Sequence, residues 1–411
     1  MKKLKRIVFA LGASIMCTAC AGVNAATYTK GTPVKVGLIC LHNEKSTYDK
    51  NFIDAMKEAA NDLGSRIAGE PIIKTDVAES IDSYNAAKDL VKQGCNVIIA
   101  DSFGHEPFML RAAKEWPSVT FCHATGTQAK VAGVSNYHNA FASIYEGRYL
   151  AGYAAGLKLA DMIEEGKLTD ANYDGDKIKL GYVGAYPYAE VVSGYTSWFL
   201  GVKAVVPNVK MQVTFTNSWY DFDAEKAGAR TLKNNGAAII SQHADSMGAP
   251  GECEEMGVPN VTYNIPLEEE CPKTYLAYSK IDWAPYYKAV VNGLYDGTGI
   301  VGEVNNNYTG TIASGSVKYA CADDSYAAIL KSVEAELTAK TRRVFDCSTF
   351  TVKGEHLTVD SDYLADVDDM GDYVSETKVI KEEGGITFYD ESALRSAPYF
   401  DINIDDIEKL N

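Results

Sequence analysis

The sequence lacks the short motifs that mark common catalytic sites. It has no Gly-x-Ser-x-Gly nucleophile turn, no His-Glu-x-x-His metal motif and no Walker-type phosphate loop. Its six histidines are scattered, and no two are spaced four apart as metal ligands on one helix face would be. An enzyme is therefore the least favoured class of function, and no metal or cofactor is expected.

Positive charge is scarce as well. The chain has 39 Lys and Arg residues against 55 Asp and Glu residues, which makes a formal net charge of −16 at pH 7. Such a surface repels nucleic acids and anionic lipid headgroups, so neither is an expected partner. The hydrophobic share of 46% nevertheless suits a globular chain. Its length allows two or three domains.

Paired cysteine motifs are also missing after Cys20. No later pair has the two-residue spacing of a zinc ribbon or a thioredoxin-like site. In an oxidising compartment we expect two disulfides, Cys253 with Cys271 and Cys321 with Cys347, whereas an anaerobic source would leave these thiols reduced. The remaining cysteines are expected as small buried residues in or beside strands: Cys40, Cys95 and Cys122.

Long apolar runs are absent. The run near the N-terminus, 7–16, is far shorter than the roughly 20 residues of a membrane-spanning helix. It follows a basic cluster at 2–6 and precedes several small residues, which is the order of a secretory signal. We predict a signal peptide at 1–25. Loss of its four positive charges would take the net charge from −16 to −20.

Two cleavage sites fit this signal. Thr18-Ala19-Cys20 resembles the end of a lipoprotein box, which makes Cys20 the lipid anchor and holds the protein on the outer face of the cell membrane. Cys17 stands where such a box usually has Leu. Val23-Asn24-Ala25 would instead suit ordinary signal peptidase and release the protein into the periplasm. The lipoprotein interpretation is preferred, and the second stays open.

From residue 34 onward, short apolar runs alternate with amphipathic segments. This order is typical of parallel sheets with helices on both faces. In the first half the expected strands are 34–40, 71–75, 96–100 and 119–122, and the expected helices are 51–63, 83–92 and 107–115. In the second half the expected helices are 144–160, 195–205 and 223–234, and the expected strands are 179–184, 211–215, 237–241 and 260–264.

Two doubly wound, Rossmann-like lobes joined by crossing strands would make a hinged clamshell. The segment 274–281 is expected to return to the first half, followed by a helix at 285–295. The predicted N-terminal lobe is then 34–140 plus 266–320, and the predicted C-terminal lobe is 141–265. Residues 321–411 are expected as an appendage packed on the N-terminal lobe. Its acidic stretch lacks the spacing of a calcium loop and is interpreted as a solvated face.

Polar and aromatic residues gather directly after five of these strands. In open α/β sheets ligands bind at the carboxyl ends of the strands, and two such edges facing each other form a small-molecule site. Flat rings can sandwich a planar heterocycle, while carboxylates and amides read its nitrogens or hydroxyls. The candidate ligand-binding residues from these loops are Asn43, Ser46, Tyr48, Asp101, Phe103, Tyr186, Trp219 and Asp245.

Several motifs, in order, resemble one known family. The chain from 34 to 297 is similar to the BMP (basic membrane protein) family of ABC-transporter substrate-binding lipoproteins. The tail beyond about 300 resembles it poorly. The motifs are Asp101-Ser102-Phe103-Gly104, Tyr145-Glu146-Gly147-Arg148, Gly181-Tyr182-Val183-Gly184, Asn217-Ser218-Trp219-Tyr220-Asp221, Gln242-His243-Ala244-Asp245-Ser246 and Asp282-Trp283-Ala284-Pro285.

The resemblance implies a type I periplasmic-binding-protein fold and a purine ligand. It implies that Tyr48 and Phe103 stack on the base while Asp101, Trp219 and Asp245 line the pocket, and it adds Trp283 to the candidates. Asn264 lies where the family often has an Asp that contacts ligand. Ser46-Thr47-Tyr48 replaces the usual Asp-Asp-x-Ser-Phe-Asn run. Because these departures affect the ribose contacts, a free purine base is as plausible as a nucleoside.

The leading hypothesis is a monomeric binding protein that captures a purine nucleoside or base and delivers it to an ABC permease. One alternative is a binder of another small polar solute, such as a sugar-like signal. A second is a sensor that is not coupled to import.

Overall fold

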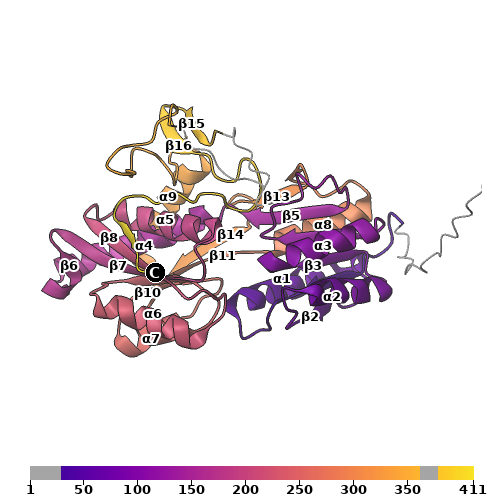
Figure 1. The fold of residues 1–411 in the computed structure, drawn as a ribbon, viewed down its shortest axis with the longest axis horizontal. Coiled ribbons are helices and arrows are strands. Elements are labelled where there is room, and N and C mark those ends of the chain that lie inside the picture. The colour runs from indigo at the N-terminus through magenta and orange to yellow at the C-terminus, as the bar shows by residue number, and fades with distance from the viewer. Residues whose placement is uncertain (1–28, 362–377) are drawn as a thin grey trace, which may run out of the picture.

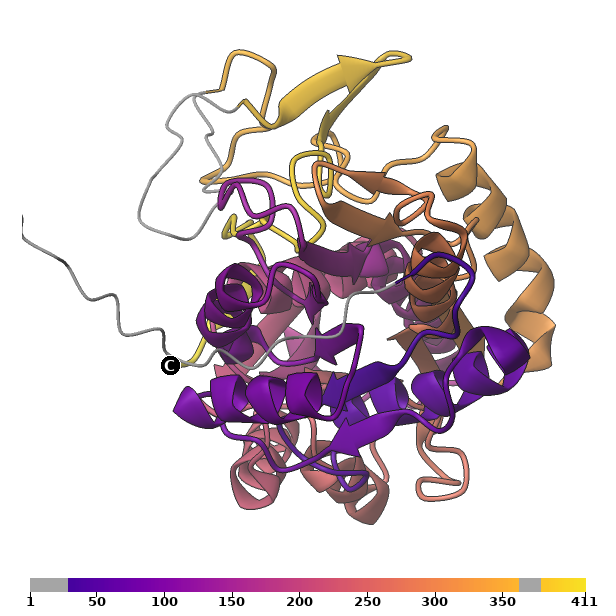
Figure 2. The same cartoon turned by 90° about the vertical axis from the view of Figure 1, so that its right-hand side faces the viewer.

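The computed structural model describes residues 29–361 and 378–411 (Figure 1). The predicted signal peptide and Cys20 lie outside these residues, as does most of the acidic stretch after Asp360. Two α/β lobes lie side by side, and C-terminal segments cover part of both (Figures 1 and 2). Among the described helices, none combines the length and apolar character needed to cross a bilayer.

The first lobe is a seven-stranded sheet covered by helices on both faces. Its order is β12-β13-β5-β4-β3-β1-β2. The strands are β1 (Val36–Ile39), β2 (Ile72–Lys74), β3 (Val97–Ala100), β4 (Thr120–Ala124), β5 (Tyr137–Ala142), β12 (Glu303–Val304) and β13 (Asn307–Gly310). Helices α1 (Thr47–Leu63) and α8 (Ala284–Asp296) share one apolar core with the sheet, and α2 (Ile81–Lys92) and α3 (Glu106–Glu115) share another. Coverage of both faces explains why β1 and β3 are continuous apolar runs.

The second lobe repeats this plan around an eight-stranded sheet. The order of its main path is β14-β11-β10-β9-β7-β8-β17, and β6 (Tyr173–Asp174) pairs with β7. The strands on the path are β7 (Lys177–Gly184), β8 (Val209–Phe215), β9 (Ile240–His243), β10 (Asn260–Tyr263), β11 (Tyr275–Ile281), β14 (Val317–Cys321) and β17 (Ile407–Lys409). Helices α4 (Ile144–Glu164) and α5 (Ala189–Lys203) cover one face, and α6 (Phe222–Asn234) and α7 (Gly248–Met256) cover the other.

Three chain crossings join the lobes. They lie at Ser143, at Asp282–Trp283 and at 311–316. Backbone hydrogen bonds hold the crossings together, with Ser143 donating to the Gly310 carbonyl at 2.8 Å and Asp282 donating to the Ser316 carbonyl at 2.7 Å. Because all three crossings are neighbours, a small change of backbone angles there can move one lobe relative to the other.

The predicted lobe boundaries need correction. The segment 266–320 was assigned to the first lobe, but β11 pairs in parallel with β10 and β14 pairs antiparallel with β11. Both strands therefore extend the second sheet, and only 284–310 returns to the first. The apolar pattern of 275–281 identifies a strand, but it carries no information on which sheet the strand joins.

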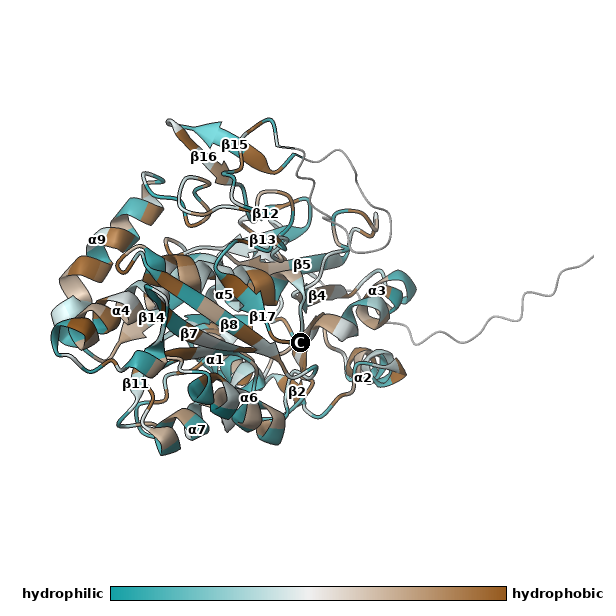
Figure 3. Cartoon of the chain, turned by 60° about the vertical axis from the view of Figure 1, so that its left-hand side comes forward, coloured by the Kyte–Doolittle hydropathy of each residue, from teal (hydrophilic) through white to brown (hydrophobic). Residues whose placement is uncertain are grey.

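The C-terminal appendage also packs differently from the prediction. It covers the second lobe, because β17 pairs with β8 and the ring of Phe400 stacks on Phe345 at 4.2 Å in the same core as α4 and α5. Helix α9 (Ala327–Thr338) buries one apolar stripe there, and its exposed face mixes polar and apolar residues (Figure 3), with Ile329 44% exposed. The hairpin of β15 (Ile380–Glu383) and β16 (Ile386–Tyr389) projects at the top of the molecule as drawn in Figure 1.

The structure confirms the predicted buried cysteines and contradicts the predicted disulfides. Cys40, Cys95 and Cys122 are buried, as expected. The two expected disulfides are wrong for this structure, because all seven cysteines among the described residues are free thiols. Burial raises the pKa of the Cys253 thiol above its usual range and that of Cys271 to about 11, so neither is a reactive thiolate at neutral pH.

A buried carboxyl ties the appendage to the second lobe. Glu391 accepts a hydrogen bond from the Ser193 hydroxyl of α5 at 2.9 Å, and burial raises its pKa to about 8. The unfolded chain releases this proton near pH 4.3. The folded state therefore binds more protons between these values, and the stability from the neutral carboxyl is lost as pH rises through about 8.

We expect Glu391→Gln to flatten the pH dependence of stability. In the wild type, Glu391 alone should lower the free energy of unfolding by up to about 1.4 kcal/mol per pH unit between pH 5 and 8. Glutamine stays neutral, so melting temperatures measured across this range should fall less in the variant. Glu382→Gln, at an exposed position of β15, is the control. Equal slopes in all three proteins would contradict the assignment.

Candidate functional site

A cavity lies where the carboxyl ends of the two sheets face each other. The first lobe contributes the segments after β1, β3 and β4, and the second contributes those after β7, β8 and β9. The structure thus brings together four of the predicted residues, Tyr48, Phe103, Trp219 and Asp245. The full lining is Leu41, Tyr48, Ser102, Phe103, Thr125, Glu190, Trp219, His243 and Asp245.

On the first lobe, Tyr48 is held against the end of β3. It lies in the first turn of α1, and its hydroxyl donates to the Asp101 carbonyl at 2.7 Å. The Asp101 side chain is fully buried behind this contact and accepts from the Leu41 N–H at 3.1 Å. Burial and the nearby Asp49 raise the pKa of Asp101 well above its usual range. Asp101 therefore positions Tyr48 from behind and does not line the cavity.

Aromatic side chains form the outer part of the cavity. Phe103 of the first lobe faces Tyr188 of the second, with ring centroids 5.6 Å apart. Tyr186 stacks on Tyr188 at 5.0 Å, and Trp219 meets the edge of Tyr186 at 5.2 Å. The predicted residue Tyr186 thus packs against the rings of Tyr188 and Trp219. Phe103 and Trp219 line the cavity itself.

Polar groups of the second lobe form the inner part. Burial, and then the carboxylates of Asp49, Glu225 and Glu190, raise the pKa of Asp245 well above its usual range. Burial lowers the pKa of His243 to about 4, and its Nε2 lies 3.3 Å from Glu190 Oε1. At neutral pH the His243 imidazole is therefore uncharged, and burial shifts the Asp245 carboxyl toward its protonated form. Together they can both donate and accept hydrogen bonds.

Arg148 supports the polar inner part of the cavity from a buried position. It is 1% exposed, its guanidinium lies 3.3 Å from the centroid of the Tyr263 ring, and Nη1 donates to the Gln242 carbonyl at 3.0 Å. These contacts hold the end of β9, where His243 lies and after which Asp245 follows. Glu190 and Arg148 were not predicted as site residues. Both lie on helices, where a charged residue is indistinguishable by sequence from one on a solvated face.

Four predicted residues lie away from the cavity. Asn43 donates to Asp76 at 2.8 Å, and Ser46 caps α1 by accepting from the Asp49 N–H. Asn264 ends β10 in a left-handed conformation (φ 72°). Trp283 is 2% exposed and stacks on Phe52 at 4.3 Å in the first-lobe core. Their positions after strands were predicted, but hydrogen bonding, capping and packing take up the side chains of Asn43, Ser46 and Trp283, whereas Asn264 is buried and its Nδ2 has no hydrogen-bond partner among the described residues.

The lobes are closed on the cavity. Across the lobe boundary, the Thr47 N–H donates to the Asp245 carbonyl at 2.8 Å. The rings of His42 and Tyr220 also meet across it, with their centroids 5.4 Å apart. Only about 20 Å³ of space remains between the lining side chains, which is roughly the room of one water molecule. A ring system can enter only when the lobes separate at the hinge.

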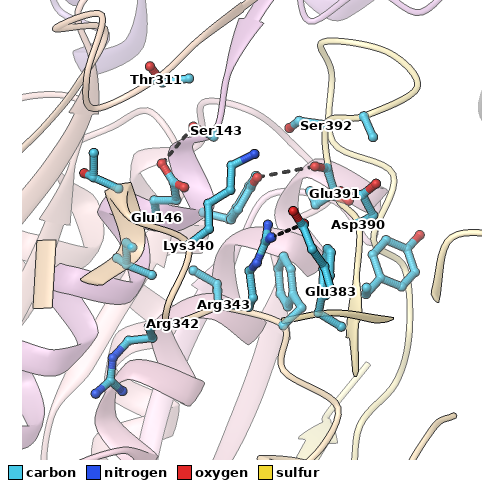
Figure 4. Close-up of a pocket in the computed structure, with 18 of the residues that line it drawn as sticks. Ser143, Glu146, Thr311, Lys340, Arg342, Arg343, Glu383, Asp390, Glu391 and Ser392 are labelled. Atoms are coloured by element: carbon cyan, nitrogen blue, oxygen red, sulfur yellow. Dashed lines mark hydrogen bonds and ion pairs between the residues drawn. The ribbon is translucent and has the colours of Figure 1, made fainter. Parts of the chain in front are cut away.

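A larger cavity of about 740 Å³ lies at the junction of α4, β13 and the appendage (Figure 4). Many of the charges around it are matched to one another. Arg343 pairs with Glu383, and Lys381 pairs with Asp390. Burial raises the pKa of Glu146 to about 7, so this carboxyl is largely neutral in mild acid. Ion pairs within the appendage and the Glu146 carboxyl of α4 thus form much of the lining of this cavity.

Sequence comparison places the chain in a family. Residues 38–271 match the Bmp family of PnrA-like ABC-transporter substrate-binding proteins. The protein belongs to this family. The match covers the residues of the interlobe cavity and ends before β11, so the C-terminal segments of this Bmp protein lie outside it.

Two curated relatives are named after different ligands. A purine-binding protein of Brucella abortus is 32% identical over 244 residues, covering 59% of this chain and 63% of the relative. A protein of Haloferax volcanii, named as a candidate ABC-transporter glucose-binding protein, is 28% identical over 229 residues, covering 55% and 54%. The Bmp protein thus spans less than two thirds of either relative.

Solved structures confirm the fold. An ABC-transporter solute-binding protein of Aeropyrum pernix K1 superposes with a TM-score of 0.60 at 11% identity, over 79% of this chain and 95% of that one. One from Conexibacter woesei DSM 14684 gives 0.57 at 19% identity, over 75% and 98%. At these identities the likeness concerns the two-lobed architecture alone, which is the type I periplasmic-binding-protein fold predicted from the sequence.

Proposed function

We propose that this Bmp protein captures a purine nucleoside or purine base between its lobes and passes it to an ABC permease, without catalysing a reaction. The observation that carries the proposal is the joining of Tyr48, Phe103 and Trp219 with Asp245 in one interlobe cavity. Three rings and one buried carboxyl are the groups needed to hold a flat heterocycle and to read its edge.

The aromatic groups supply affinity. Offset stacking contributes roughly 0.5–1.5 kcal/mol per ring pair beyond the burial of apolar area. Phe103 comes from the first lobe, and Trp219 comes from the second. A ring held between them would touch both lobes at once, so its binding favours the closed arrangement. This coupling of ligand to closure is what a carrier that presents its ligand to a permease requires.

The polar groups supply specificity. Asp245 is 5% exposed and His243 is 3% exposed, so a ligand that leaves either without a hydrogen-bond partner loses the full cost of burying that group. A purine edge offers both ring nitrogens that accept and amino or N–H groups that donate. The Asp245 carboxyl and the neutral His243 imidazole can match such an alternating edge.

Thermal shift against a panel of purine bases, nucleosides and sugars tests the proposal. A ligand at 100 times its Kd should stabilise the protein by about 2.7 kcal/mol. We expect a rise in melting temperature with at least one purine compound and with no hexose. The absence of a shift with every purine at millimolar concentration would overturn the proposal.

A small polar solute such as a sugar is the second candidate. It is supported by the glucose-binding name of the Haloferax volcanii relative and by the carboxyl groups of Glu190 and Asp245 in the cavity. A shift with hexoses alone would establish it. A protein anchored through Cys20 beside a permease remains the proposed setting, with a sensor uncoupled from import as the alternative.

A further inference from the structure

Three buried groups that can bind metals lie together behind Tyr48. Cys40 follows β1, Asp101 follows β3, and Asp49 lies in the first turn of α1. The Cys40 sulfur and one carboxylate oxygen of each aspartate all lie within 4.8 Å of one another. Cys40 and Asp101 are fully buried, and Asp49 is 1% exposed. We call this group the thiol–carboxylate cluster.

His105 directs a ring nitrogen at the cluster. Its side chain is fully buried, and its Nε2 lies 2.8 Å from the Val77 carbonyl oxygen, which makes Nε2 the donor. In the neutral ring Nδ1 then carries a lone pair. This Nδ1 lies 3.9 Å from Asp101 Oδ1 and has no hydrogen-bond partner among the described residues. Histidines that bind metals are oriented in this way, with the other ring nitrogen donating to a carbonyl or carboxylate.

The two aspartates of the cluster lack a cationic partner. Within 29–361 and 378–411, no Lys or Arg forms an ion pair with either of them, and Asp101 Oδ2 has no hydrogen-bond partner. Asp49 accepts from the His42 N–H at 2.8 Å and from the Ser46 hydroxyl, contacts that orient its carboxylate without neutralising it. Buried charges are paired or coordinate metals, and each carboxylate oxygen has a second lone pair for an ion. A divalent cation would therefore supply both the missing charge and the missing partners.

We infer that the thiol–carboxylate cluster and His105 together form a zinc site. A thiolate and an imidazole favour Zn²⁺ over Mg²⁺ and Ca²⁺, which take oxygen ligands. Four side chains suit a structural zinc ion, whose tetrahedral ligand atoms lie roughly 3.3–3.8 Å apart. The 3.9 Å between His105 Nδ1 and Asp101 Oδ1 is close to that range. The Cys40 thiol releases its proton to solvent when the ion binds.

The ion would brace the first-lobe side of the ligand cavity. Asp49 adjoins Tyr48 in α1, and Phe103 follows Asp101 by two residues, so the ion would tie together the two segments that carry these rings. The Thr47 N–H bonds to the second lobe, so separation of the lobes uncovers this end of α1 and gives the ion a route of entry. The zinc site goes beyond the proposed function and does not depend on the identity of the captured ligand.

Cobalt(II) titration of the metal-free chain from residue 26 onward tests the inference. Co²⁺ occupies tetrahedral zinc sites, and a thiolate bound to it gives a charge-transfer absorption in the near ultraviolet. We expect the wild type to bind one Co²⁺ with this absorption, and we expect Zn²⁺ to displace it. Cys40→Ser should abolish the absorption. Asp101→Asn, which is nearly isosteric, should weaken metal binding more than about tenfold.

Cys122→Ser is the matched control, because Cys122 is another fully buried thiol, in β4 of the same sheet and outside the cluster. It should retain the absorption of the wild type. Circular dichroism verifies the fold of each variant, and the titration of the wild type is decisive even where a variant does not fold. Survival of the absorption in Cys40→Ser would overturn the zinc site. So would its absence from the wild type, in which case Asp49 and Asp101 share a proton instead of an ion.

Discussion

Replacement of Phe103 by alanine is expected to weaken purine binding about thirtyfold while leaving the fold intact. Phe103 lies at the first-lobe side of the cavity, and its ring faces Tyr188 across the cleft. Its removal takes away one stacking surface and the apolar area that the ligand covers, together about 2 kcal/mol. Since 1.4 kcal/mol is a factor of ten in Kd, titration of the best purine ligand measures this loss directly.

Phe222→Ala controls for the loss of an aromatic ring elsewhere. Phe222 is 46% exposed at the start of α6, outside the cavity lining, and its removal should leave affinity within twofold of the wild type. If Phe103→Ala and Phe222→Ala bound the ligand equally well, Phe103 would not be part of the binding site. Circular dichroism of both variants verifies that the fold is retained.

Gly152→Ala should destabilise the second lobe by about 3 kcal/mol. Helices α4 and α5 approach closely, and an ideal Cβ on Gly152 would lie 2.1 Å from the Trp198 carbonyl oxygen. The backbone of α5 cannot move aside as a flexible side chain could. The two helices must therefore separate, which loosens the core that contains Trp198. Urea unfolding and melting temperature measure the loss.

Gly251→Ala is the matched control within another helix. Gly251 lies in α7, and a Cβ there meets nothing within 4 Å. The same substitution should stabilise that helix by up to about 1 kcal/mol, because alanine has the higher helix propensity. If both substitutions changed stability equally, close packing of α4 on α5 would not be the reason for Gly152.

The order of helices and strands could be predicted because each element carries its own pattern. Strands β1 and β3 are short apolar runs, and α1 has apolar residues at helical spacing. Strand β5 was not predicted, because Tyr-His-Asn-Ala-Phe-Ala mixes polar and apolar residues. The glycines of α4 fall within a regular helical pattern, and the structure uses Gly152 and Gly156 for the close approach of α5 and of the residues that follow it.

The site could be predicted only in part. Residues such as Phe103 and Trp219 follow strands and reach the cavity, as the edge rule for parallel sheets implies. Ser46 and Trp283 obey the same pattern, yet one caps a helix and the other fills a core. A position after a strand decides which edge of the sheet a residue occupies. It does not decide which neighbouring groups the side chain contacts.

The sequence by itself determined the class of fold, the pairing of two α/β lobes and the loops from which a ligand site could be made. These are consequences of local periodicity and of the chain order of strands and helices. Only the tertiary structure decided that β11 and β14 join the second sheet, that Glu190 enters the cavity and that β17 pairs with β8 of the second lobe. Those facts depend on contacts between residues far apart in the chain. Such contacts leave no local pattern, because the packing energy that selects them is gained only once both partners are folded.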